Sequence, residues 1–204
     1  MKKLLLFIIL FIIPSNSFAL ITVDITRGNL NPLPVAVSPI SSSEKTRLLL
    51  EKELKIKDLG SEISKIVENN LKTTGLFNPL NKDAFLQKED IAHLKPRFED
   101  WRLIKAQALI TGKVELKEQK LRVEFRLWDV LAGKEILALA FTTVPKNWRR
   151  VGHIITDKVY ERLTGEKGYF DTRIIYVAEE GPKIKRIKKL AIMDQDGFNT
   201  KYLT

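Results

Sequence analysis

Cysteine is absent from the 204-residue chain, and histidine occurs only twice. Without cysteine there is no disulfide framework and no lipid attachment at a cysteine, so stability must come from a buried core. His93 and His153 lie far apart and outside the short spacings that gather zinc. Motifs for a serine nucleophile elbow or a phosphate-binding loop are also missing. The sequence therefore predicts no enzyme active site, no metal and no cofactor.

Long hydrophobic runs are also absent, except at the amino terminus. Lys2 and Lys3 precede an apolar run over residues 4–13. A membrane-spanning helix needs about 20 apolar residues, whereas a shorter run after basic residues is typical of a secretory signal. Ser17-Phe18-Ala19 has the small-x-small pattern of a cleavage site, so cleavage is predicted between Ala19 and Leu20. Residues 1–19 are therefore a predicted signal peptide, and the periplasm is the predicted location.

Basic residues exceed acidic ones, with a formal net charge of +10 that includes two lysines of the predicted signal. An exported chain does not meet nucleic acid, and its lysines are scattered among glutamates, so an anionic surface or an acidic partner is expected instead. The basic residues of segment 183–189 alternate with Ile184 and Ile187, which favours a solvated strand face.

Residues 20–26 alternate in polarity and predict an extended arm. Apolar side chains are expected on one side and polar ones on the other, in the order Ile21, Thr22, Val23, Asp24, Ile25 and Thr26. Such a strand can add to the edge of a partner's sheet through its unpaired backbone groups. The alternative is that the arm forms an edge of its own domain's sheet, with residues 28–34 as a tether either way.

A helix is predicted between Asp58 as N-cap and Gly75 as the residue after its end. Apolar residues recur there at helical spacing, namely Leu59, Ile63, Ile66, Val67 and Leu71. Residues 35–37 predict a short strand. The charged segment between Ser43 and Asp58 is predicted to be a loop, and residues 77–79 are predicted to lie in another.

The middle of the chain changes to a period of two. Residues 108–116, the alternating residues 121–127 and residues 136–144 predict three strands with short joints, hence an antiparallel meander. A weakly helical stretch precedes them around Trp101. A second amphipathic helix follows, with Asn147 predicted as its N-cap, Gly165 as its stop, and His153 inside it as an interface residue. The predicted fold class is α+β, with two helices packed on a mixed sheet.

Past Gly168 three further strands are predicted, over residues 173–178, 188–193 and 199–203. They have no obvious pairing partners within the chain, which suggests a truncated second domain. Asp194, Asp196 and Gly197 invite a calcium interpretation, but the spacing does not fit the EF-hand loop. An Asp-Gly turn between two strands explains the same residues and is favoured.

Several segments resemble the amino-terminal domain of the TolB family. These are residues 75–80 (GLFNPL), 106–112 (AQALITG), 126–129 (RLWD), 148–153 (WRRVGH) and 157–177 (DKVYERLTGEKGYFDTRIIYV). The last string is similar to the family's junction between two domains and is highly specific. The resemblance covers the chain from residue 20 onwards.

The resemblance implies a non-catalytic periplasmic adaptor of the Tol-Pal system, which maintains outer-membrane integrity and aids outer-membrane invagination during division. It implies a TolA-like partner for the arm and a Pal-like lipoprotein for a six-bladed β-propeller, of which residues 169–204 would be only the start. Residues 20–34 would be the arm and linker, and 35–168 the α/β domain. No small-molecule substrate is expected. The rival interpretation is the amino-terminal fragment of an exported peptidase that carries a propeller.

Overall fold

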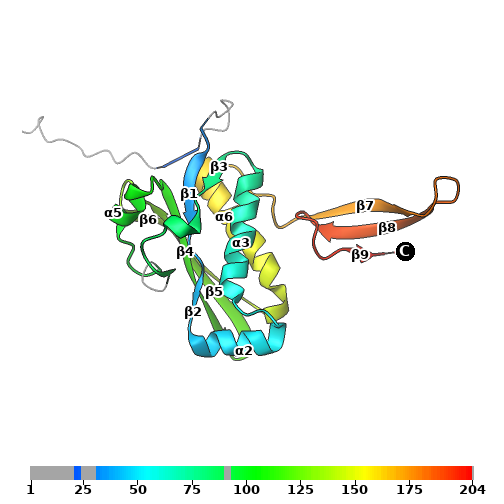
Figure 1. Cartoon of the computed structure of the whole chain (residues 1–204), viewed down its shortest axis with the longest axis horizontal. Helices are drawn as coiled ribbons and strands as arrows, with labels where there is room; N and C mark the ends of the chain where they lie inside the picture. Colours follow the sequence, from blue (N-terminus) through cyan, green and yellow to red (C-terminus); the bar gives the residue numbers. More distant parts are fainter. Residues whose placement is uncertain (1–20, 24–30, 90–92, 204) are drawn as a thin grey trace, which may run out of the picture.

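The computed structural model describes residues 21–23, 31–89 and 93–203 (Figure 1). The predicted signal peptide, its cleavage site at Ala19 and Leu20, and the arm residues Asp24, Ile25 and Thr26 lie outside the described residues. Within the described part, no helix combines the length and the apolar character needed to cross a membrane.

A mixed sheet forms the centre of the domain, in the order β3-β1-β4-β5-β6, with β2 also pairing with β4. Strands β1, β2 and β3 lie in parallel pairs, whereas β4, β5 and β6 form the predicted antiparallel meander. The strands are β1 (Leu33–Val37), β2 (Ser41–Ser42), β3 (Phe77–Pro79), β4 (Ala108–Lys117), β5 (Lys120–Asp129) and β6 (Lys134–Thr143).

Helices α3 (Leu59–Thr73) and α6 (Trp148–Thr164) pack on one face of this sheet (Figure 1). Alternation along β5 explains the arrangement, because every second side chain from Leu121 to Leu127 is fully buried against the helices. Both helices are therefore confirmed, as is the α+β class.

The ends of the two helices follow the predicted chemistry with one exception. Asp58 accepts a hydrogen bond from the backbone N–H of Ser61 at 3.1 Å and so caps α3. Gly165 ends α6 with a φ of 80°, a left-handed conformation that glycine adopts without strain. Asn147 occupies the N-cap position of α6, but its side chain donates to Thr143 Oγ1 instead of capping the helix.

Two predicted loops were wrong. The charged segment after Ser43 forms helix α2 (Glu44–Leu54), which Ser43 caps through the N–H of Thr46 at 3.2 Å. The sequence does not reveal this helix, because Thr46 and Leu50 are the only buried residues of α2 and the helix therefore has almost no apolar stripe. Residues 77–79 form β3, a strand that exists through parallel pairing with β1 rather than through local pattern.

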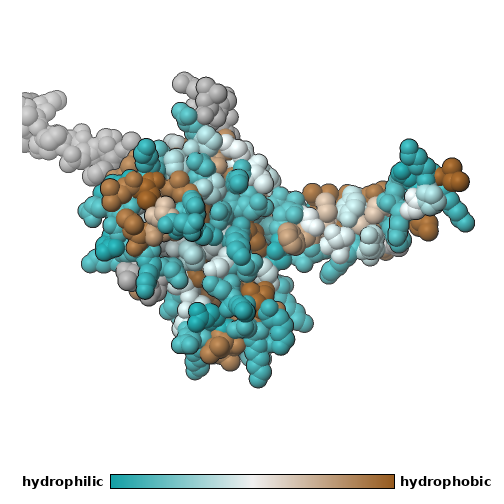
Figure 2. All heavy atoms as spheres, viewed as in Figure 1, coloured by the Kyte–Doolittle hydropathy of each residue, from teal (hydrophilic) through white to brown (hydrophobic). Residues whose placement is uncertain are grey.

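A second, smaller core covers part of the opposite face of the sheet, beside the short helix α5 (Phe98–Leu103). Trp101 and Trp128 are its large members, and Trp101 donates to Gln87 Oε1 at 3.2 Å. Figure 2 shows apolar side chains gathering on the outside over α5. The most exposed leucines of this region are Leu86, Leu94, Leu103 and Leu131.

The remaining strands form a separate antiparallel sheet of β7 (Arg173–Glu180), β8 (Ile187–Asp194) and β9 (Lys201–Tyr202). This sheet projects from the helix side of the domain (Figure 1), and its apolar residues remain largely exposed. Ile175 and Val177, for example, are 62% and 58% exposed. The turn that follows β8 contacts both helices, through Gln195 to α3 and Asp196 to α6.

Candidate functional site

The arm begins by contacting its own domain. The backbone N–H of Ile21 donates to Asp129 Oδ2 at 3.2 Å, and that of Val23 donates to the carbonyl of Leu163 at 2.7 Å. Val23 is 6% exposed and belongs to the main core, whereas Thr22 is exposed. The predicted alternation is therefore present over residues 21–23.

This docking differs from both uses of the arm that the sequence suggests. Val23 binds the last turn of α6 rather than the edge of a strand, and residues 21–23 carry no strand pairing in the described structure. A partner that takes these residues must therefore displace Val23 from a buried site.

Asp129 is the residue that anchors the arm, and sequence analysis did not single it out for this role. It is 1% exposed at the end of β5. One carboxylate oxygen accepts from Ile21 and the other accepts from the backbone N–H of Ala132 at 2.8 Å. The bond from Ile21 joins segments 108 positions apart, whereas the bond from Ala132 crosses a turn. No spacing in the sequence therefore reveals the two bonds together.

The second candidate region is the junction between the helices and the turn after β8. Asp194, Asp196 and Gly197 form the predicted turn, in which Gly197 has a φ of 86° and its N–H donates to the carbonyl of Asp194 at 2.9 Å. Asp196 forms an ion pair with Arg149 of α6. Gln195 donates to Asn70 Oδ1 of α3 at 2.9 Å. The turn is thus tied to both helices.

Buried Asn70 organises the junction. Because its Oδ1 accepts from Gln195, its amide nitrogen faces α6 and donates to His153 Nδ1 at 2.9 Å and to Thr156 Oγ1 at 3.2 Å. Nδ1 of His153 is then an acceptor, which places the proton of the neutral ring on Nε2. His153 lies at a packing interface, as predicted, although Nε2 has no hydrogen-bond partner in the described structure.

The charge of His153 is set mainly by its burial. The ring is 2% exposed, and this desolvation lowers its pKa below the ordinary value of 6.5, while the Asp196 carboxylate acts in the opposite direction. Nε2 lies 3.6 Å from Asp196 Oδ2, which is too long for a hydrogen bond.

Folding brings His153, Asp194 and Asp196 together, with one potential ligand atom from each within 4.8 Å of the others. The donors fit a metal poorly. Asp196 Oδ2 is already paired with the Arg149 guanidinium, and His153 Nε2 carries a hydrogen rather than a free lone pair. The cluster is better described as an ion-pair junction.

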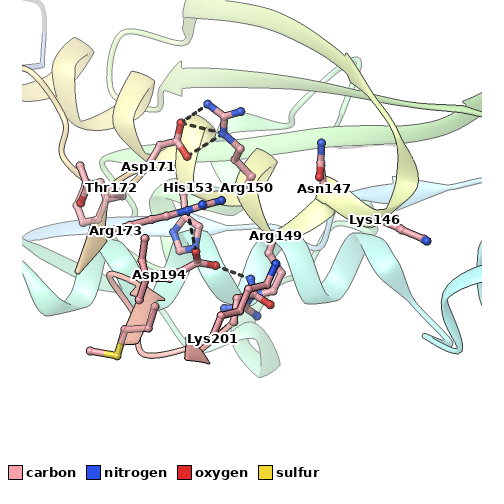
Figure 3. Close-up of a pocket in the computed structure, with 14 residues that line it drawn as sticks. Lys146, Asn147, Arg149, Arg150, His153, Asp171, Thr172, Arg173, Asp194 and Lys201 are labelled. Atoms are coloured by element: carbon pink, nitrogen blue, oxygen red, sulfur yellow. Dashed lines mark hydrogen bonds and ion pairs between the residues drawn. The ribbon is translucent and has the colours of Figure 1, made fainter. Parts of the chain in front are cut away.

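A pocket of about 510 Å³ opens beside this junction, between the start of α6 and the second sheet (Figure 3). Arg150 binds Asp171 in bidentate fashion at 3.0 and 3.1 Å, and Arg173 lies 3.8 Å from Asp194. Asn70, Arg149 and Gln195 were missed by sequence analysis because only the folded chain brings them together.

The fold and these contacts define a class of two-part protein, in which a small α/β domain is joined by buried polar contacts to a following antiparallel sheet. Comparisons with known proteins give the family. A profile of the TolB amino-terminal domain matches residues 21–136. The chain is 78% identical over 199 residues to the Tol-Pal system protein TolB of Pelagibacter ubique. The aligned region covers 98% of this chain and 45% of that protein.

The chain therefore belongs to the TolB family. The crystal structure of TolB from Acinetobacter baumannii shares its fold, with a TM-score of 0.68 at 22% sequence identity, over 85% of this chain and 39% of that one. The chain thus spans about half the length of the curated relative, at 45%.

Proposed function

We propose that the protein is a non-catalytic periplasmic adaptor of the Tol-Pal system, which supports outer-membrane integrity and outer-membrane invagination during division. Membership of the TolB family supports this proposal, because the 78% identical relative is a Tol-Pal system protein. The division into a signal peptide (1–19), an arm and linker (20–34), an α/β domain (35–168) and the start of a propeller (169–204) is part of the same proposal.

The arm is the proposed contact with a TolA-like inner-membrane protein, through Ile21, Thr22, Val23, Asp24, Ile25 and Thr26. Its alternating sequence suits addition to the edge of a partner's sheet. Docking of Val23 on α6 adds a cost, because partner binding must release one backbone hydrogen bond and one buried side chain. The docked and partner-bound arms therefore compete.

Energetics set the expected strength of this contact. Burial of three β-branched side chains contributes about 1.5–3 kcal/mol each, and ordering a flexible segment costs about 2–5 kcal/mol. Undocking Val23 reduces the balance further. The interaction is therefore of moderate strength and reversible.

A Pal-like lipoprotein is the second proposed partner, but only for a whole protein that carries the complete propeller. The present chain contains a three-stranded sheet, proposed as the start of that part, whose apolar side chains are largely exposed. Nucleic acid and a small-molecule substrate are not among the proposed partners. The rival interpretation, a fragment of an exported peptidase, is not favoured because the family match runs through the α/β domain itself.

A pair of charge substitutions on the arm tests the adaptor proposal. Ile25→Asp places a carboxylate on the apolar side of the strand, and Thr26→Asp places the same charge on the polar side. Calorimetric titration with a TolA-like carboxy-terminal domain should show binding lost in Ile25→Asp and retained in Thr26→Asp. Thermal unfolding of both variants serves as the control for folding.

If both variants bind as the unmodified chain does, the arm is not the contact. Equal loss in both variants would show that added negative charge, rather than the apolar side of a strand, decides binding. Either result would remove the arm from the proposal.

A further inference from the structure

The pocket beside the junction carries more positive than negative charge after its ion pairs are assigned. Its three arginines are each matched by one carboxylate, in the pairs Arg149 with Asp196, Arg150 with Asp171 and Arg173 with Asp194. Lys146 and Lys201 also line the pocket, and neither has a carboxylate within 4.0 Å among the described residues. Two cations are therefore left without a counter-charge.

Hydrogen-bond donors are also in excess at this place. The Nε–H of Arg149 and the Nε2–H of His153 are buried and have no acceptor within the described part of the chain. Both residues line the pocket, and His153 is 2% exposed. These groups lie beneath the pocket surface, where they add to its positive potential.

The excess of hydrogen-bond donors and of positive charge favours a negatively charged ligand. A metal ion needs free lone pairs, which Asp196 and His153 do not offer because Arg149 and the Nε2 hydrogen occupy that space. An anion instead gains from the two unmatched lysines, and a concave site concentrates their field. Figure 3 shows side chains of α6, the following linker and the second sheet around this space, whereas the Lys146 side chain points away from the other labelled residues.

We propose that this pocket binds a phosphate group, held mainly by Lys201. A phosphate monoester carries a charge of about −1.5 to −2 at neutral pH, which is opposite in sign to the surplus charge of the pocket lining. Its oxygens accept several hydrogen bonds at once, which suits a wall rich in donors. This inference is independent of the arm and of partner binding.

Titration of the full chain with inorganic phosphate at constant ionic strength, followed by NMR, tests the site. Saturable shifts are expected for residues around the pocket, and the pKa of His153 should rise because a nearby anion favours its charged form. Lys201→Gln should weaken phosphate binding about fivefold, the size expected for one exposed ion pair. Lys183→Gln is the matched control, because it removes an exposed lysine from the loop between β7 and β8, away from the pocket.

Vesicles of an anionic phospholipid provide a second arm of the experiment. Binding that depends on Lys201 but not on Lys183 would identify a lipid headgroup as the source of the phosphate. Saturable binding of inorganic phosphate alone would identify a soluble ligand. Shifts that do not saturate, an unchanged His153 pKa, or equal behaviour of the two lysine variants would overturn the proposal.

Discussion

Replacement of Asn70 by alanine should destabilise the protein more than any surface substitution on the same helix. Asn70 is 1% exposed and makes three side-chain hydrogen bonds, to His153, Thr156 and Gln195. Asn70→Ala removes all three and leaves His153 Nδ1 without the donor that fixes its tautomer.

The magnitude follows from these bonds. Each intramolecular hydrogen bond contributes about 0.5–1.5 kcal/mol net, so the loss amounts to about 3 kcal/mol. For a chain of this size, each kcal/mol lowers the melting temperature by about 2–4 °C, so a decrease of about 6–12 °C is expected.

Asn69 provides the control because it is the adjacent residue in α3 and is exposed. Asn69→Ala should change stability by no more than about 0.5 kcal/mol. Thermal denaturation followed by circular dichroism measures both variants, and NMR of the His153 ring reports its tautomer. If Asn70→Ala melts within about 1 °C of Asn69→Ala, or if the tautomer is unchanged, the proposed role of Asn70 in the junction is refuted.

Three further predictions concern pH, processing and the second sheet. Burial lowers the pKa of His93 and of His153 below the ordinary histidine value of 6.5, so in mildly acidic solution the unfolded chain binds more protons than the folded chain. Chemical denaturation should therefore show lower stability at about pH 5.5 than at about pH 7.5. Equal or greater stability in acid would contradict this prediction. Mass spectrometry of exported protein should find Leu20 as the first residue, and retention of Met1 in that material would exclude the predicted signal. Limited proteolysis should cleave β7 to β9 before α3 or α6, because their side chains are largely exposed; equal resistance would show that this sheet is part of the domain core.

Elements with a strong period could be predicted from the sequence, and elements that depend on distant pairing could not. Helix α3 and strand β5 place apolar residues at spacings of three to four and of two, so their patterns identify them. Helix α2 has only two buried residues and no such stripe. Strand β3 has three residues, one of them Pro79, and its identity comes from pairing with β1 more than 40 positions away.

The candidate sites show the same division. The alternation of the arm could be predicted, but its docking depends on Asp129, which lies 108 positions from Ile21 in the sequence. The Asp-Gly turn after β8 could also be predicted from turn chemistry. Its contacts with Asn70 and Arg149 could not, because only the packing of α3 on α6 places them beside the turn.

The central claim, that the arm itself binds the inner-membrane partner, is tested most directly with the arm alone. A synthetic peptide of residues 20–29 should bind a TolA-like carboxy-terminal domain in a calorimetric titration, with a dissociation constant on the order of micromolar. Because the free peptide has no domain on which to dock Val23, it should bind at least as tightly as the full chain. Absence of binding by the peptide, with binding retained by the full chain, would contradict the claim and place the contact elsewhere on the domain.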